Sequence, residues 1–265
     1  MLLAAVLSSP KLSESGKRRE DYLEAIVLAG GLGTRLRSVV DKVPKTMAPI
    51  NGKPFLEYLI SYWEGQGVER FILSIGYLGS LVEEYFGDKF RNASIGYVRE
   101  ESPMGTGGAL LKALGTVRDD KTVLLLNGDT LFAVDLNKFR SFHKSTGSEF
   151  SLSLFPSTNQ RYAGVKINGE GRISSLGIDG SLEERFVNGG VYLFDKESFA
   201  DVGFKNDGPC SLESDLLPII LRDGHPVFGC VSDSFFIDIG IPEDYARFDE
   251  FCRTGKINYL IMDSN

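Results

Sequence analysis

The residues of this chain that could do chemistry begin in a glycine-rich segment that follows a short apolar run. Residues 25–28 are apolar and are typical of a buried parallel strand, and Gly30–Gly33 follow almost directly. Glycines let a loop direct several backbone N–H groups into one concavity, which suits a phosphate. Thr34 adds a hydroxyl, and Arg35 adds a planar, permanently charged guanidinium suited to phosphate oxygens. The segment therefore predicts a phosphate-binding loop at the end of a strand.

Two familiar glycine-rich motifs do not fit this loop. A Walker A loop needs a Lys directly after its last glycine, and Thr34 follows Gly33 instead. A dinucleotide-binding fingerprint needs a glycine at the position of Leu36. The loop is therefore typical of neither motif.

Segment Leu28–Leu36 resembles the signature L-A-G-G-x-G-T-R-L of the sugar-1-phosphate nucleotidylyltransferases, also called sugar-nucleotide pyrophosphorylases. The resemblance implies that the loop binds a nucleoside triphosphate. It also implies a catalytic role for Arg35, which would receive the charge that builds up on pyrophosphate. The nucleotide-binding residues implied in this segment are Leu28, Ala29, Gly30, Gly31, Gly33 and Thr34.

Two further segments extend the resemblance on the nucleotide side. Residues 44–49 are similar to the family's P-K-x-M-x-P, whose Lys reaches the phosphates, and this implies a catalytic role for Lys45. Residues 100–110 are similar to the base-binding loop E-x-x-P-x-G-T-x-G-A-L, which implies that Glu100, Gly105 and Thr106 bind the nucleotide. A carboxylate only accepts hydrogen bonds, so Glu100 suits guanine, whose ring N–H and amino group form a pair of donors.

Two aspartates match the family's metal ligands. Asp129 follows a buried strand, and Asp238 lies in the segment 235–245. Mg²⁺ prefers one or two carboxylates together with phosphate oxygens and water. The resemblance therefore implies Mg²⁺ as the cofactor, held by this pair.

The sugar-binding segments are matched less completely. Residues 187–192 resemble the sugar-binding strand, which implies that Asn188 meets sugar hydroxyls and that Gly189 leaves room for the sugar ring. Residues 161–165 are similar to R-Y-G-x-V displaced by one residue, which puts Gly164 in the site. Many members carry a Lys shortly before the sugar strand that holds the sugar phosphate, and residues 174–179 contain none. Either Arg185 substitutes for it or Lys45 serves both phosphates.

The reaction implied by the family is nucleotidyl transfer. An oxygen of the sugar phosphate attacks the α-phosphorus of the triphosphate in line, and pyrophosphate leaves. A phosphate is already a competent nucleophile, so no Ser, Cys or His is required, and catalysis consists of positioning and charge neutralisation.

Within the family, residues 45–50, 105–109 and 236–245 most resemble the guanylyltransferases that act on D-glycero-α-D-manno-heptose 1-phosphate. These use GTP and serve nucleotide-sugar and surface polysaccharide biosynthesis. Mannose-1-phosphate guanylyltransferases and other nucleotide-sugar pyrophosphorylases are the alternatives. An alternative of another class is a catalytically silent, nucleotide-binding regulatory homologue. The absence of the Lys that holds the sugar phosphate would be consistent with this alternative.

Composition narrows the partners and the compartment. The 265 residues carry a net charge of −7, from 29 basic and 36 acidic residues, and this balance offers no electrostatic footprint for nucleic acid or an anionic membrane. No run of about 18 apolar residues could form a membrane span. Three widely spaced cysteines indicate reduced thiols of a cytoplasmic protein. His143 and His225 have polar neighbours and are expected at the surface. Formation of a homo-oligomer is left open.

The pattern of apolar residues predicts a single α/β domain. Apolar runs at 71–75, 95–98 and 123–126 predict strands, the last of them fully buried, and helical patterns at 54–63, 78–85 and 107–114 lie between them. This alternation implies a Rossmann-like, doubly wound sheet with ligands beyond the strand carboxyl ends, and the resemblance implies the nucleotide-diphospho-sugar transferase fold. Asn51-Gly52 predicts a type I′ turn.

The second half and the N-terminus differ from this pattern. Strand-like runs at 150–155, 164–167 and 186–194 predict a more mixed sheet that covers the crevice, with helices at 211–221 and 242–251. The apolar stretch Leu2–Leu7 is short for a secretory signal and has no basic residue before it. We therefore expect residues 1–23 to be an extension and residues 24–265 to be the nucleotidyltransferase domain.

Overall fold

A computed structural model describes residues 23–31, 33–36, 40–118, 122–159, 161–178, 185–199 and 208–262. The predicted extension, apart from Leu23, lies outside the described residues, as do Leu32 and the side chain of Thr34. None of the helices in these ranges is long and apolar enough to cross a bilayer.

The first half of the chain forms the parallel part of the sheet. Its strands are β1 (Glu24–Leu28), β4 (Arg70–Ile75), β6 (Ala93–Arg99) and β7 (Thr122–Asn127). They pair in the order β7-β1-β4-β6, all parallel, and short β5 (Lys89–Phe90) adds an antiparallel edge. Leu28, the last residue of β1, pairs with Ser74 on one side and Asn127 on the other, so the carboxyl ends of three strands are level. The strands predicted at 71–75, 95–98 and 123–126 are confirmed, and residues 123–126 of β7 are buried as expected.

The second half extends this sheet instead of covering it. Its strands are β9 (Phe150–Ser157), β10 (Gly164–Ile167), β11 (Ile173–Ile178), β12 (Arg185–Asp195) and β13 (Val227–Val231). β12 runs antiparallel to β7, with Val191 opposite Leu126, and joins both halves into one mixed sheet. The mixed sheet predicted for the single domain is confirmed, and the position of the second half beside the parallel strands is set by the pairing of β12 with β7, which are distant in sequence.

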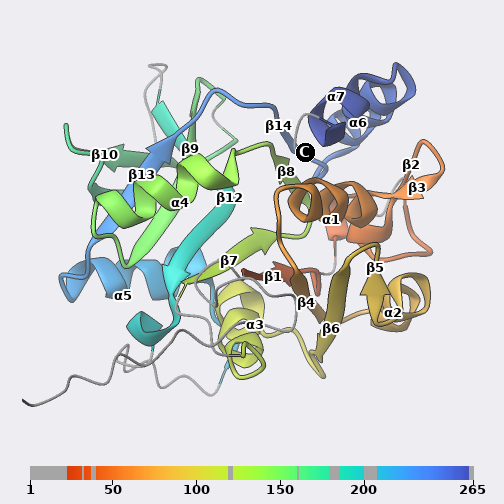
Figure 1. The fold of residues 1–265 in the computed structure, drawn as a ribbon, viewed down its shortest axis with the longest axis horizontal. Coiled ribbons are helices and arrows are strands. Elements are labelled where there is room, and N and C mark those ends of the chain that lie inside the picture. The colour runs from red at the N-terminus through yellow and green to blue at the C-terminus, as the bar shows by residue number, and fades with distance from the viewer. Residues whose placement is uncertain are drawn as a thin grey trace, which may run out of the picture.

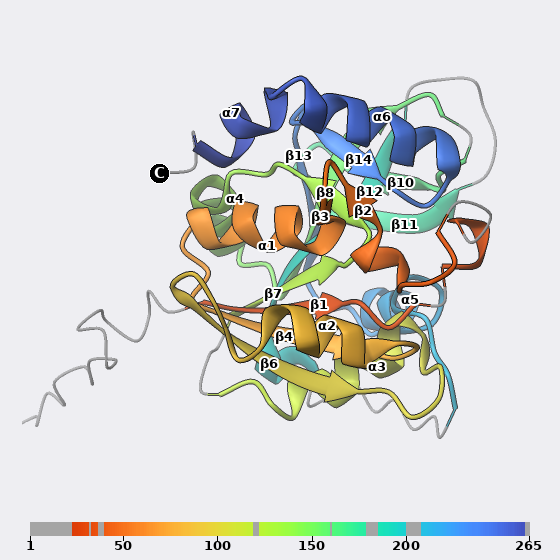
Figure 2. The same ribbon diagram turned by 90° about the vertical axis from the view of Figure 1, so that its right-hand side faces the viewer.

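Helices cover both faces of the sheet, as a doubly wound fold requires (Figures 1 and 2). One core cluster packs under α1 (Phe55–Gly65), α2 (Gly79–Phe86), α4 (Leu136–Ser145), α6 (Pro242–Arg253) and α7 (Lys256–Met262). The other packs under α3 (Gly105–Leu114), the π-helical turn Leu212–Leu216 and α5 (Leu217–Arg222). The sequence therefore predicted the layers of the fold correctly.

Short elements connect the layers. Three 3₁₀ turns span Thr34–Leu36, Lys45–Met47 and Lys196–Phe199, and β2 (Pro49–Ile50) pairs with β3 (Lys53–Pro54) in a hairpin. The φ angles of Asn51 and Gly52 between them are 45° and 81°, as the predicted type I′ turn requires. β8 (Thr130–Phe132) pairs antiparallel with β14 (Phe236–Asp238), and this two-stranded ladder brings residue 238 to the carboxyl end of β7.

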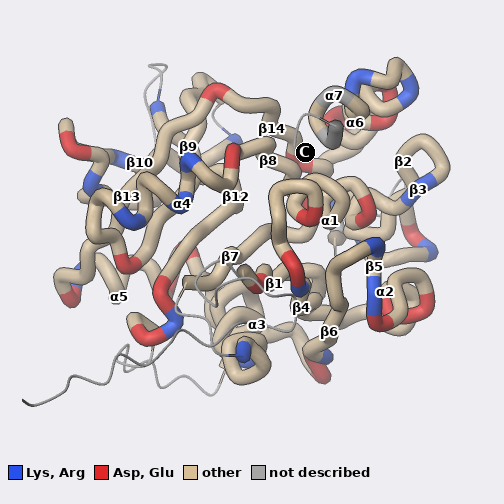
Figure 3. Tube along the Cα trace, viewed as in Figure 1, with Lys and Arg blue, Asp and Glu red and all other residues tan. Residues whose placement is uncertain are grey.

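Charged residues are spread over the molecule. In Figure 3, Lys and Arg are interspersed with Asp and Glu over both halves of the described trace. The charge for phosphate binding therefore has to come from a few local side chains. One expectation for polar residues fails, because His143 is buried on α4, where its Nδ1 lies 2.9 Å from the Ser151 hydroxyl of β9.

Candidate active site

The glycine loop after β1 lies against Glu100. A Cβ atom on Gly30 would lie only 2.0 Å from Glu100 Oε1, so glycine is required for this close approach. The carboxylate is held by two protein donors, the Ser74 hydroxyl at 3.1 Å and the Met104 backbone N–H at 3.3 Å. A carboxylate has about four acceptor positions, so Glu100 can still accept hydrogen bonds from a base.

The other end of the same loop lies against Lys45. Gly33 has a φ of +56°, and a Cβ atom there would lie 2.6 Å from Lys45 Cβ. Leu36 is buried and anchors the 3₁₀ turn after the loop, whereas Arg35 on that turn is exposed, as is Gly31. The loop thus extends from Glu100 to Lys45, and Arg35 is accessible beside it.

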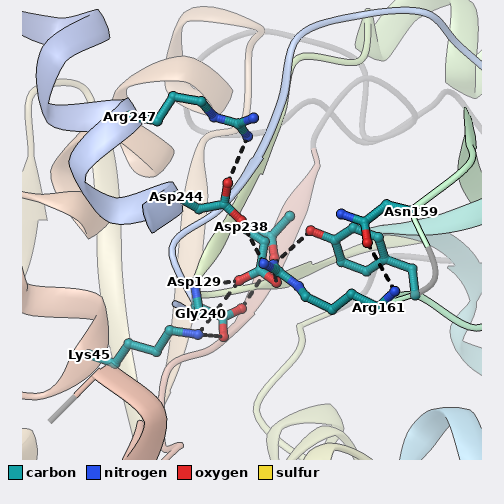
Figure 4. A network of polar contacts seen from close by, with 10 residues as sticks. Lys45, Asp129, Asn159, Arg161, Asp238, Gly240, Asp244 and Arg247 are labelled. Atoms are coloured by element: carbon teal, nitrogen blue, oxygen red, sulfur yellow. Dashed lines mark hydrogen bonds and ion pairs between the residues drawn. The ribbon is translucent and has the colours of Figure 1, made fainter. Parts of the chain in front are cut away.

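The two predicted metal-binding aspartates meet at Lys45. The β8–β14 ladder places Asp238 opposite Thr130, the neighbour of Asp129. Lys45 Nζ lies 2.5 Å from Asp129 Oδ2 and 3.7 Å from Asp238 Oδ1 (Figure 4). The Gly240 backbone N–H donates to Asp238 Oδ1 at 2.7 Å, and the Thr130 hydroxyl donates to Asp129 Oδ1 at 3.2 Å.

This arrangement fits Mg²⁺. Both carboxylates contact the same ammonium group, so their oxygens converge on one cation, and their side chains are 36% and 19% exposed. Among the residues that the structure describes, no group of three or more acidic, His or Cys side chains gathers as a metal site. Two carboxylates suit a magnesium ion whose other ligands are substrate phosphate oxygens and water.

Arg161 joins this cluster, although sequence reasoning did not assign it a role. Its Nη2 donates to Asp238 Oδ2 at 2.7 Å, and its Nη1 donates to Asp244 Oδ2 at 2.6 Å. Burial lowers the pKa of Arg161, but the hydrogen bonds that it donates to Asp244 and Asp238 outweigh burial and raise the pKa overall. Burial, reinforced by the charge of Asp238, raises the pKa of Tyr162 to about 12, so this phenol stays neutral. The resemblance of residues 161–165 to the family's R-Y-G-x-V motif was the sequence signal that could have placed Arg161 in the site.

The predicted sugar-binding residues lie on β10 and β12. Asn188 donates through Nδ2 to the Tyr192 hydroxyl at 2.8 Å, and its Oδ1 accepts from the Gly190 N–H at 3.0 Å. Gly164 is buried opposite Val187. The proposed space at Gly189 is filled by protein, because a Cβ there would lie 2.2 Å from the ring of Phe132. Gly189 therefore makes room for the ring of Phe132, and its place in the sugar site stays a prediction.

A polar network links the base loop to the sugar strand through Glu213, which sequence reasoning missed. Thr106 donates to Glu213 Oε2 at 2.9 Å, and Tyr192 donates to Oε1 at 3.0 Å. Burial, with the nearby charge of Glu213, raises the pKa of Tyr192 well above its ordinary value. The Thr106 hydroxyl also accepts from the Leu212 N–H at 2.8 Å, so it joins α3 to the π-helical turn Leu212–Leu216. Gly105, the first residue of α3, packs against the carbonyl of Cys210.

The chain belongs to the nucleotidyl transferase family, which residues 24–255 match. It is similar to a D-glycero-α-D-manno-heptose 1-phosphate guanylyltransferase of Aneurinibacillus thermoaerophilus, with 41% identity over 225 residues, covering 85% of this chain and 96% of that protein. The Campylobacter jejuni protein of the same name is 37% identical over 230 residues, covering 85% of this chain and 98% of that protein.

A solved structure supports the same relationship. The crystal structure of HddC from Yersinia pseudotuberculosis has a TM-score of 0.75 and 34% identity, and covers 86% of this chain and 98% of that one. The same protein has been solved in complex with GMP-PN. The predicted family, its closeness to heptose 1-phosphate guanylyltransferases and the fold class are confirmed.

Proposed function

We propose that this chain transfers GMP from GTP to D-glycero-α-D-manno-heptose 1-phosphate and releases pyrophosphate. The single observation that carries the proposal is the geometry of the glycine loop. Its Gly30 end touches the acceptor Glu100, and its Gly33 end touches Lys45, which contacts Asp129 and Asp238. A nucleotide lying along this loop has its base and its phosphates beside the matching side chains. The identity of the sugar is inferred from the two relatives that are named as heptose 1-phosphate guanylyltransferases.

The chain's own residues then account for the chemistry. Glu100 accepts from the ring N–H and the amino group of guanine, and the loop N–H groups hold the triphosphate. Lys45 neutralises charge at the α-phosphoryl group, and Arg35 does so at the leaving pyrophosphate. The sugar phosphate is the nucleophile, and the protein positions it and stabilises charge in the transition state.

Asp129 and Asp238 are the residues that would hold Mg²⁺. A bound Mg²⁺ would supply neutralisation of the negative charge on the substrate phosphates. Lys45 would then give up part of its contact with Asp129 and direct its ammonium to phosphate oxygens.

The reaction product indicates the biosynthetic role of the protein, and its thiols indicate the cellular compartment. A nucleotide-activated heptose is a donor for glycosyl transfer, which is consistent with a role in polysaccharide biosynthesis. Cys210, Cys230 and Cys252 are free thiols, and GTP is a cytoplasmic substrate, so we place the enzyme in the cytoplasm. The catalytic domain in this proposal spans residues 24–265.

The test is release of pyrophosphate from GTP and heptose 1-phosphate, with and without Mg²⁺. Asp129→Asn and Asp238→Asn should keep the fold but lower turnover by orders of magnitude, because charge stabilisation by a metal is worth several kcal/mol. Asp233→Asn, a change at an exposed loop residue, is the matched control and should keep normal turnover. Near-normal Mg²⁺-dependent turnover in both site variants would contradict the metal assignment. No turnover in the unaltered protein would favour the silent regulatory homologue.

A further inference from the structure

We propose that Arg161 binds the phosphate of the sugar 1-phosphate, in place of the Lys that this chain lacks, and that Asp244 orients it. The inference rests on the proposed function and adds a residue to it. It begins from a gap in the sequence, because residues 174–178 offer no basic side chain before the sugar strand. The sugar phosphate is an anion, and a cation near the acidic pair is needed to hold it.

Arg161 lies in the right place for this role. Its Nη2 is 2.7 Å from Asp238 Oδ2, so the guanidinium borders the position where the two aspartates converge. In Figure 4, Arg161 and Lys45 approach Asp238 from opposite sides. Lys45 lies on the side of the glycine loop, where the triphosphate is expected. Arg161 follows β9 and precedes β10, on the side of the sugar-binding strands.

Other contacts fix the orientation of the guanidinium. Asp244 Oδ2 accepts from Nη1 at 2.6 Å, and the Tyr162 hydroxyl accepts from Nη2 at 2.7 Å. The ring of Tyr162 also lies under the guanidinium, with its centroid 4.7 Å from Cζ. An arginine has five N–H donors, so these contacts leave donors for a phosphate oxygen. A guanidinium held in place also loses less side-chain entropy when it binds.

The positive and negative side chains around Arg161 are equal in number, so a cation bound by the aspartates would leave positive charge for anionic substrates. Lys45, Arg161 and Arg247 contact Asp129, Asp238 and Asp244, and the formal charges of these six side chains cancel. If Asp129 and Asp238 bound a divalent cation, the ion pairs of Lys45 with both aspartates and of Arg161 with Asp238 would weaken. Their positive charge is then available to the phosphates, and the interaction is strengthened by partial burial, since Arg161 is only 20% exposed.

The two residues proposed from sequence fit the role less well. Arg185 donates through Nη2 to the Asn159 carbonyl at 3.2 Å, and Asn159 also holds the backbone N–H of Arg161 through its side chain. Arg185 therefore supports the turn that carries Arg161. Lys45 is engaged at Asp129, beside Gly33, where the nucleotide phosphates are expected.

Steady-state kinetics with heptose 1-phosphate tests the assignment. Arg161→Ala should raise the KM for heptose 1-phosphate by roughly 10- to 100-fold, the range for one charge-assisted hydrogen bond, and change the KM for GTP by less than about threefold. Arg161→Lys should recover part of the loss, since a point charge cannot reproduce the fork. Asp244→Asn should raise the same KM more modestly. Arg253→Ala, an exposed arginine on α6 paired with Asp249, is the charge-matched control and should match the unaltered enzyme.

Binding of Mn²⁺ in the absence of substrates, followed by electron paramagnetic resonance, gives a readout besides turnover. Arg161→Ala should bind Mn²⁺ at least as tightly as the unaltered protein, because a competitor for Asp238 is removed. Weaker Mn²⁺ binding would show that Arg161 only holds Asp238 in place. An unchanged KM for heptose 1-phosphate in Arg161→Ala, or a larger rise of this KM in Arg185→Ala, would overturn the role of Arg161 but not the proposed function. Absence of turnover in the unaltered enzyme would overturn the proposed function with it.

Discussion

Arg35 is the residue whose role can be tested most sharply by substitution. It is exposed on the turn after the glycine loop, so its replacement should leave the fold unchanged. Arg35→Ala should slow the chemical step by roughly 10²–10³-fold, as loss of one strong transition-state donor typically does. Arg35→Lys should recover only part of the rate. The measurement is single-turnover kinetics, and an alanine variant with a changed KM and an unchanged kcat would show that Arg35 only binds substrate.

At the same scale, sequence motifs identified Lys45, Asp129 and Asp238, and the structure brings these three together. They could be predicted because each lies in a specific sequence motif at or beside a strand end. Arg161 could not be assigned, because its partners are 77 and 83 residues away and are placed by the β8–β14 ladder and α6. Polar partners of this kind depend on tertiary packing, which no local pattern encodes.

The elements that carry the base loop and the sugar strand are joined by Glu213. Glu213→Ala would leave the hydroxyl donors of Thr106, Ser211 and Tyr192 without this acceptor. We expect the free energy of unfolding to fall by at least about 2 kcal/mol. We also expect the KM for both substrates to rise, because the loss loosens α3 and β12 together. Chemical denaturation and initial-rate kinetics measure these effects.

Glu250→Ala, at an exposed position of α6, is the control for this experiment and should have neither effect. Unchanged stability together with unchanged KM values in Glu213→Ala would contradict the idea that the network links the two elements.

The elements themselves were predictable to different degrees. The parallel strands β1, β4 and β7 are buried on both faces, so they are near-continuous apolar runs that a local pattern identifies. β6 is only partly buried, and its apolar pattern is correspondingly weaker. The attachment of β12 to β7 was not predictable, since antiparallel pairing between distant strands leaves no mark in either strand. Glu213 sits in a predicted helical segment, and nothing local shows that it faces the buried Tyr192.

At the scale of the whole molecule, residues 1–22 should be dispensable. The family match begins at residue 24, and Leu23 and Glu24 are buried in the body of the protein. A chain shortened to begin at Leu23 should keep its Tm and its kcat, because the first strand and its contacts are complete. Thermal unfolding, size-exclusion chromatography and pyrophosphate release are the measurements. Lost activity with a changed oligomeric state would show that the extension serves assembly.

We infer that the site selects guanine through Glu100 and a heptose 1-phosphate through the second half of the sheet. Uracil and thymine present a carbonyl oxygen where guanine presents its amino group, and a buried mismatch of this kind costs roughly 1–3 kcal/mol. The most direct measurement follows pyrophosphate while GTP, UTP, dTTP and CTP are each combined with glucose, mannose and heptose 1-phosphates. We expect the kcat/KM with GTP to exceed that with the other nucleotides by about tenfold to over a hundredfold, and the kcat/KM with heptose 1-phosphate to exceed that with mannose 1-phosphate. A preference for UTP or dTTP would contradict this inference, and equal rates with mannose 1-phosphate would contradict its sugar specificity.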